Sequence, residues 1–346
     1  MSLPGGRFVA EAHIFSSGFF ETLCIEVEGG VFRESDGRPS VRLALFEDVV
    51  DAHTHCADYG LRVPPGMSIE ELVAPPDGLK HRYLRSASPE ELSASMSRFS
   101  ADAASFGCRS FIDFREGGAE GCRLFRNACP GAVVLGRPVS SEFDPGEVEE
   151  ILSCADGIGL PSISDMPSKY LEQVADAVRG KGAVLAIHAS ERVREDIDEV
   201  LSLDPAFVVH MCEASDSDLL KCAEAEVPAV VCPGSNMYFG KAPPLARMAD
   251  LGVDIALGTD NGMLRPPDMA SEAALFVEAM ESQGGDPSAV FGSLSSLNSK
   301  ILNRKIRIGR ERQRRFMAVP FEGVPVPGEV FRKGVSGTAL ATREGS

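Results

Sequence analysis

Several features are scarce or missing in this chain of 346 residues, and each absence excludes a class of protein. No run of about 20 apolar residues occurs, so the sequence predicts no bilayer-spanning helix. The first ten residues lack the basic start and apolar core of a secretory signal, and we expect none. Basic residues (34) are outnumbered by acidic ones (51), and the net charge of −17 argues against a general nucleic-acid or anionic-membrane surface.

Closely spaced cysteine pairs are also missing. The nine cysteines are an odd number without any C-x-x-C, and several lie in apolar runs, among them Cys108, Cys212 and Cys232. Buried thiols in a reducing compartment explain this pattern better than a disulfide framework does. We therefore expect a cytoplasmic protein. The remaining composition, 44% hydrophobic and 25% charged, is that of an ordinary globular chain long enough for two domains or one large barrel with an appendage.

Histidine is scarce as well, and the positions of the six histidines are informative. His53 and His55 stand two residues apart at the end of an apolar run, and on a β-strand both side chains point to the same side. Taken by itself, this motif is explained as well by two histidines on the protein surface. However, His188 and His210 also end apolar, strand-like runs far downstream.

From residue 49 onward, apolar strand-like runs alternate with amphipathic helical segments. Several runs are apolar throughout, which is typical of parallel strands that are covered on both faces. The eight predicted strands are 49–55, 108–114, 132–139, 157–163, 183–187, 207–209, 229–232 and 254–257. Eight β/α units over about 250 residues match a TIM barrel. We therefore predict an α/β fold with a (β/α)8 barrel over residues 48–303.

The two chain ends are predicted to form a second, smaller unit. Short strands at 7–12, 23–27 and 41–46 need a partner sheet, and the strand-like segments 316–319 and 324–330 offer one. We predict a small β-sandwich domain formed by residues 1–47 plus 304–346. A basic cluster at 300–315 could contact nucleic acid, but we interpret it as polar decoration of these strands.

A TIM barrel places its catalytic groups at the C-terminal ends of its strands. The first predicted strand ends in His53 and His55, the fifth is followed by His188, the sixth by His210, and the eighth runs into Asp260. Each of these side chains alone is more often a hydrogen-bonded core residue. Together they would converge on one barrel mouth and form a metal site.

These motifs resemble those of the amidohydrolase superfamily, in the same order and over most of the chain. The matching segments are His53-Thr54-His55, His188, His210 and Gly258-Thr259-Asp260. Two further segments are similar to those of the mononuclear branch, which holds the adenosine, cytosine and guanine deaminases and the chlorotriazine hydrolases. They are His188-Ala189-Ser190-Glu191 and Cys232-Pro233-Gly234-Ser235-Asn236.

The resemblance implies one divalent ion with four ligands, which are His53, His55, His188 and Asp260. Binuclear members bridge two metals with a lysine, glutamate or cysteine after strand four, and that strand carries none here. Zinc is our first choice and iron the alternative, because both accept mixed nitrogen and oxygen ligands. Metal binding lowers the pKa of water to about 7. Asp260 would take the water proton, His210 would orient the hydroxide, and Glu191 would pass protons to the substrate nitrogen and the departing amine.

This set predicts a metal-dependent hydrolase of carbon–nitrogen bonds other than peptide bonds, which deaminates a nucleobase, a nucleoside or a related N-heterocycle. A cyclic amide hydrolase resembling imidazolonepropionase and a metal-retaining, non-catalytic binding module remain as alternatives. For substrate contacts we propose Arg115, Asn236 and His81, with Lys80, Arg82 or Arg115 receiving an anionic part of the substrate. We expect a small-molecule substrate and no nucleic-acid or membrane partner, and we leave a homo-oligomer open.

Two regions lie outside the motifs that carry the resemblance. The proline-rich stretch 56–88 is predicted to be a structureless lid or binding loop, with a solvated insertion as the alternative. The C-terminal region lacks the glycine-rich Ala-Asp signature that is usual in the family. This departure concerns the small domain and leaves the predicted metal site unaffected.

Overall fold

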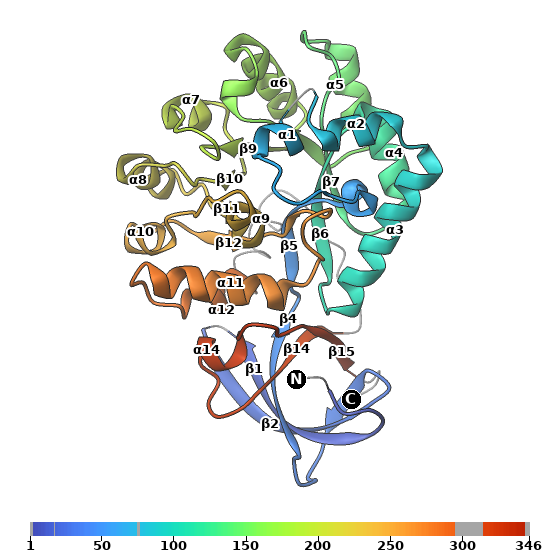
Figure 1. Ribbon diagram of the computed structural model, residues 1–346, viewed down its shortest axis with the longest axis vertical. Coiled ribbons are helices and arrows are strands. Elements are labelled where there is room, and N and C mark those ends of the chain that lie inside the picture. Colours follow the sequence, from blue (N-terminus) through green and yellow to red (C-terminus); the bar gives the residue numbers. More distant parts are fainter. Residues whose placement is uncertain (1–2, 17, 75–76, 295–313, 343–346) are drawn as a thin grey trace.

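The computed structural model describes residues 3–16, 18–74, 77–294 and 314–342 (Figure 1). These residues form two β units that follow one another along the long axis of the molecule. The larger unit is a curled parallel sheet surrounded by helices, and the smaller one collects strands from both chain ends, blue and red in Figure 1. No described helix combines the length and the apolar composition of a transmembrane span.

The parallel sheet contains nine strands in the order β12-β11-β10-β9-β8-β7-β6-β5-β13. Their bounds are β5 Val50–His55, β6 Ser110–Arg115, β7 Val133–Gly136, β8 Gly157–Leu160, β9 Val184–Ala189, β10 Phe207–His210, β11 Ala229–Val231, β12 Ile255–Leu257 and β13 Asp260–Asn261. Only Gly258 and Thr259 separate β12 from β13, and β13 pairs with β5. The sheet therefore curls until its last strand segment lies beside its first strand.

Helices cover the outer face of this sheet (Figure 1). They are α3 Pro89–Ser105, α4 Gly118–Ala128, α5 Pro145–Leu152, α6 Ser168–Gly180, α7 Ile197–Ser202, α8 Asp216–Glu224, α10 Leu245–Asp250 and α11 Met269–Ser282. Along β6, Phe111 packs in the cluster under the helices, whereas Ile112 packs in a second cluster inside the curled sheet. Both faces of the strands are buried, which explains why several of the runs are apolar throughout.

The helices begin at residues that satisfy their free backbone N–H groups. In α8 the Ser215 side chain accepts a hydrogen bond from the Asp218 N–H, and the Asp218 carboxylate accepts one from the Ser215 N–H at 2.8 Å. Arg194 also donates two bonds to this carboxylate, at 2.7 and 2.8 Å. These bonds from Arg194, with further ones from Ser215, lower the pKa of Asp218 to about 2.

We expect Asp218→Asn to lower the free energy of unfolding by about 1 to 2 kcal/mol at pH 7, because it removes the charge from this buried cap. The folded-state pKa lies below the ordinary 3.8, so the stabilisation is complete above pH 4 and fades as the pH falls toward 2. Urea unfolding at pH 7 and pH 3 should show a deficit that shrinks at the lower pH. The control is Asp216→Asn, at an exposed pair with Arg247. An equal deficit at both pH values would contradict the assignment.

The segment 56–88 was predicted to be structureless, and this prediction is wrong. It contains η1 Cys56–Gly60, α1 Ile69–Leu72 and α2 Leu79–Ser86. Ser68 caps α1 through a capping box with Glu71. This Ser-x-x-Glu pattern is a local signal for the start of a helix, but the proline content of the segment led us to predict a loop. Three further short helices follow β8, β11 and α11: η2 Ile163–Asp165, α9 Pro233–Tyr238 and α12 Ala289–Gly292.

The small unit is a closed barrel, so the predicted β-sandwich is wrong. Its strands are β1 Phe8–Ser16, β2 Phe19–Glu28, β3 Val31–Glu34, β4 Val41–Glu47, β14 Arg315–Phe321 and β15 Thr338–Thr342. Their order is β1-β2-β3-β15-β14-β4, and β4 pairs with β1 as well as with β14. This double pairing leaves no free edge between two separate sheets.

The prediction of a strand at residues 324–330 is also wrong. Residues 324–330 contain the helix α14 Pro327–Val330, and the strand is β15 further along. Most of the basic cluster, residues 300–313, lies outside the described residues, as does the predicted domain boundary at 303. Arg314 forms an ion pair with Glu47 of β4 at 2.6 Å, as expected for polar decoration of a strand.

Candidate functional site

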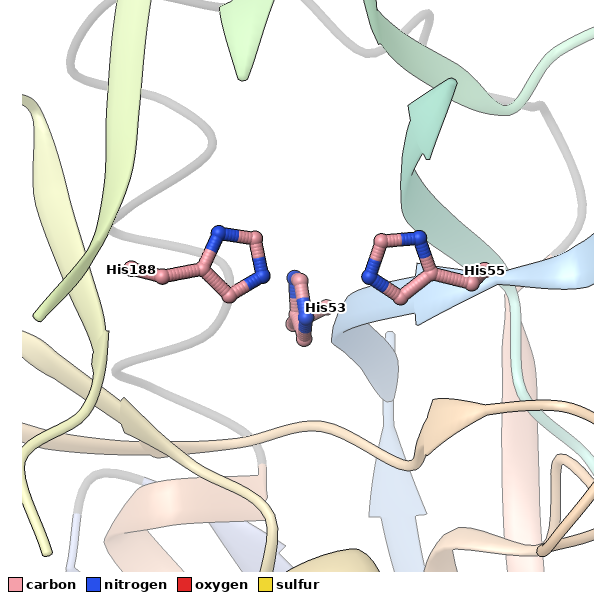
Figure 2. Close-up of side chains that lie close together, drawn as sticks. All are labelled: His53, His55 and His188. Atoms are coloured by element: carbon pink, nitrogen blue, oxygen red, sulfur yellow. The ribbon is translucent and has the colours of Figure 1, made fainter. Parts of the chain in front are cut away.

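Four imidazoles and one carboxylate meet at the carboxyl ends of the parallel strands. β5 carries His53 and His55, β9 carries His188, β10 ends in His210, and β13 begins with Asp260. Figure 2 shows the rings of His53, His55 and His188 pointing toward one another, and their nearest nitrogens lie within 4.8 Å. The same limit holds for ligand atoms of His53, His210 and Asp260. The five side chains predicted to converge are therefore brought together.

Hydrogen bonds at the back of two rings aim their other nitrogens at this centre. His55 Nδ1 lies 3.1 Å from the Phe114 carbonyl oxygen, and His188 Nδ1 lies 2.8 Å from that of Leu160. Because a carbonyl only accepts, each Nδ1 carries the hydrogen and each Nε2 keeps a lone pair. Both nitrogens of His53 are buried without a hydrogen-bond partner among the described residues. Buried polar atoms rarely stay unpaired, so this group fits a metal ion.

The protonation states also suit metal binding. Burial lowers the pKa of His53 to about 3 and of His210 to about 4, and lowers that of His188 well below its usual range. Burial opposes ionisation of Asp260, but the contact with His53 at 3.3 Å and the electrostatic attraction of the surrounding histidines outweigh it and hold its pKa well below the usual range. Neutral imidazoles and an ionised carboxylate are the forms that bind metals.

The backbone is bent sharply where these side chains enter the site. His210 has φ +79° and Asp260 φ +62°, in the left-handed region that few non-glycine residues adopt. Gly258, two residues before Asp260, lies so close to β5 that a Cβ there would sit 2.8 Å from the backbone nitrogen of His53. The position of His53 therefore depends on the missing side chain at Gly258.

We expect Gly258→Ala to push β5 away and displace His53. The free energy of unfolding should fall by about 1 to 3 kcal/mol, as for other overpacked cores, and affinity for a divalent ion should fall with it. Chemical unfolding and zinc titration measure the two effects. The control is Gly180→Ala at the end of α6, where a Cβ meets nothing within 4 Å. Wild-type zinc affinity in Gly258→Ala would show that the glycine does not position His53.

A second carboxylate and two amides surround His210 and Asp260. Glu191 Oε1 lies 3.7 Å from His210 Nε2, and burial, helped by the charge of Asp260, raises the pKa of Glu191 to about 8. Asn236 contacts His210 Nδ1 at 3.1 Å, so it lies behind this ring. Asn261 donates to Asp260 at 2.7 Å.

No family model matches the chain, but related sequences do. A "Putative aminohydrolase" of Methanothermobacter thermautotrophicus is 31% identical over 278 residues, which cover 71% of this chain and 72% of the relative. The chain belongs to the amidohydrolase superfamily. It spans about two thirds of the length of the curated relatives it matches.

Two solved structures share the fold of this amidohydrolase. The adenosine deaminase of Xanthomonas campestris with bound zinc superposes with a TM-score of 0.70 at 16% identity, over 95% of this chain and 89% of that one. The guanine deaminase of C. acetobutylicum with bound guanine gives a TM-score of 0.61 at 13% identity, over 91% of each chain.

A lysine, a glutamate and an asparagine also meet beside the amidohydrolase site, and the sequence predicts a role only for the lysine. Lys80 reaches in from α2 and places its Nζ 3.1 Å from Asn261, 3.2 Å from Glu116 and 3.8 Å from Asp58. Glu116 also lies 3.2 Å from His55 Nδ1. Burial alone would raise the pKa of Glu116, but the charges of Lys80 and its other cationic neighbours hold it well below its usual range. Glu116 directly follows β6, and Asn261 stands next to Asp260 beyond the predicted eighth strand. This position after a strand end is the signal that could have found them.

The structure gives the predicted substrate contacts of this amidohydrolase other partners. Arg115 is buried and pairs with Glu116 at 2.6 Å, and Arg82 donates to the Asp77 carbonyl at 2.5 Å. His81 contacts the Val73 carbonyl at 3.0 Å through Nε2 while lining the space above the site. Their roles as substrate contacts stay predictions.

Proposed function

We propose that this amidohydrolase deaminates a nucleobase, a nucleoside or a related N-heterocycle and releases ammonia. The observation that carries the proposal is the arrangement of Glu191, His210 and Asp260 beside the histidine cluster. The protonated carboxyl of Glu191 lies 3.7 Å from the neutral imidazole of His210, whose ligand nitrogen lies within 4.8 Å of the ionised carboxylate of Asp260. The curated aminohydrolase relatives and the deaminase structures support the same reaction class.

We infer one divalent ion, with zinc as the first choice because the adenosine deaminase of similar fold holds it. Its ligands would be His53, His55, His188 and Asp260. A divalent ion at this centre would supply the Lewis acidity that activates water near neutral pH. The neutral histidines and the ionised carboxylate need no change of protonation to accept it.

The chain's own residues would move the protons. Water adds its oxygen to the carbon that bears the amine, and Asp260 accepts the proton that water loses. Glu191, protonated at neutral pH, gives its proton to the ring nitrogen and relays the water proton to the amine. His210, held from behind by Asn236, orients the attacking oxygen. The carbon–nitrogen bond then breaks and ammonia leaves, and the hydroxyl on the carbon becomes a carbonyl as its proton restores the acid form of Glu191.

The direct test is a screen of purified, zinc-loaded protein for ammonia release from nucleobases, nucleosides and related heterocycles. Deamination of at least one class supports the proposal. Ring opening of a cyclic amide without ammonia would favour the imidazolonepropionase-like alternative, and tight binding of heterocycles without turnover would favour the binding module. Metal analysis of the same sample decides between zinc and iron.

We also infer that the curled sheet is a complete (β/α)8 barrel over residues 48–303, with 1–47 plus 304–346 as a separate domain. β4 ends at Glu47 and β14 begins at Arg315, so the described strands of the small unit respect these bounds. Nine free cysteines favour a reducing compartment such as the cytoplasm.

A further inference from the structure

The space directly above the histidine cluster is too small for the proposed class of substrate. The cavity that His55 and His188 help to line measures about 70 Å³, whereas small-molecule sites usually enclose about 300 to 1,000 Å³. A second cavity of about 800 Å³ adjoins it, and three residues line both cavities: His81, Arg137 and Pro161. A substrate of ordinary size that reacts at the cluster therefore has to extend into the larger cavity.

The larger cavity combines apolar walls with four guanidinium groups. Its apolar lining includes Leu84, Leu92, Met96, Leu124 and Leu160, and the arginines are Arg85, Arg115, Arg123 and Arg137. Three of the arginines are already paired with carboxylates. Their partners are Asp77 for Arg85 at 3.4 Å, Glu116 for Arg115 at 2.6 Å and Glu150 for Arg123 at 2.8 Å.

Arg137 is the exception. Its guanidinium makes no hydrogen bond or ion pair with any residue in the part of the chain that the structure describes, although the side chain is only partly exposed. Burial lowers the pKa of Arg137, opposed by the charges of Glu116 and Asp165, but an arginine remains charged in proteins. Both carboxylates have other partners, since Glu116 contacts Lys80 and Asp165 pairs with Arg192.

The backbone holds Arg137 at the junction of the two cavities. Arg137 directly follows β7, its N–H donates to the Arg115 carbonyl at 2.8 Å, and its carbonyl accepts from the Gly118 N–H at 3.2 Å. A partly buried charge without a partner is costly in the free protein. Proteins typically retain a destabilising charge of this kind where a bound ligand supplies the missing partner.

We propose that Arg137 binds an anionic substituent, a carboxylate or a phosphate, of the heterocyclic substrate, whose remaining bulk occupies the larger cavity. The proposal rests on the deaminase function inferred above. It replaces the expectation that Lys80, Arg82 or Arg115 receives the anion, because those cations have partners within the protein. The planar fork of a guanidinium matches two oxygens of either anion.

The test uses matched pairs of compounds with zinc-loaded protein: adenosine with adenosine 5′-monophosphate, and 9-ethyladenine with 9-carboxymethyladenine. Calorimetric binding and ammonia release are measured for each compound. We expect the anionic member of at least one pair to bind about 10-fold to 100-fold more tightly, and the pair that shows the preference identifies phosphate or carboxylate. Arg137→Gln should abolish the preference without changing the neutral member, and Arg137→Lys should restore part of it. The control Arg123→Gln, at a paired arginine of the same cavity, should keep the preference.

Several results would overturn the proposal. They are equal affinity within both pairs, no binding of either anion, or an equal loss in Arg123→Gln and Arg137→Gln. A melting temperature that falls in ligand-free Arg137→Gln would show that Arg137 is a structural residue, whereas an unpaired guanidinium predicts an unchanged or higher one. Arg137-dependent binding without ammonia release from any compound would refute the deaminase function and leave the anion site standing.

Discussion

Replacing His188 with alanine should remove the bound metal and ammonia release together. The ring of His188 is held by the Leu160 carbonyl so that its Nε2 faces the cluster, and alanine offers no replacement ligand. Without the ion, water is not activated at neutral pH, and we expect kcat/KM to fall by at least about 10³-fold. Elemental analysis should give about one zinc per wild-type chain and a small fraction of that in the variant.

The matched control is His13→Gln in the small barrel. His13 is also a buried histidine, but it contacts Glu11 and Thr22 far from the cluster. Its replacement should leave metal content and kcat unchanged. Full ammonia release by metal-free His188→Ala protein would refute the proposed metal centre, and circular dichroism of both variants separates lost chemistry from lost folding.

Glu191→Gln should lower kcat by about 10²-fold to 10⁴-fold while metal content stays at the wild-type value. Glutamine keeps the shape and the hydrogen-bonding capacity of the side chain but cannot give up a proton to the ring nitrogen or accept one for the amine. Because the change acts on proton transfer, KM should move little. The exposed control Glu213→Gln, at the ion pair with Lys241, should keep kcat within about twofold.

The pH profile tests the same role independently. Burial and Asp260 raise the pKa of Glu191 to about 8, so the acid form predominates below that pH and is lost above it. A bound cation favours the carboxylate, and the wild-type kcat should therefore fall above a limit at or below about pH 8. Glu191→Gln should lack this descending limb. An unchanged kcat or an unchanged limb in the variant would exclude Glu191 as the proton shuttle.

Much of the candidate site could be predicted because its residues stand at the ends of strands. His53 and His55 end a largely apolar run, His188 and His210 follow runs that are apolar throughout, and parallel strands bring their carboxyl ends to one edge. The order of the motifs then pointed to the amidohydrolase superfamily, as the aminohydrolase relatives show. This part depends on local pattern alone.

The small unit shows where local pattern fails. The strands of a sandwich and those of a closed barrel both turn every second side chain toward a core, so the residue pattern of β1 or β4 cannot distinguish the two architectures. The parallel pairing of β4 with β1 decides the architecture, and it is a contact between segments about 30 residues apart. The helix α1, in contrast, could have been predicted from the capping box at Ser68, because that signal is local. The prediction of a structureless segment gave too much weight to the prolines around it.

The sequence by itself determined the alternation of strands and helices, the five residues that meet around the proposed metal, and the family. Only the tertiary structure decided that Lys80 and Arg115 have partners inside the protein, while the guanidinium of Arg137 has none among the residues that the structure describes. None of the three residues can be told apart in this respect by the sequence, which shows each only as a basic side chain. Whether a cation is free depends on which carboxylates lie within a few ångströms of it, and those distances are set by the packing of segments that are remote in the chain.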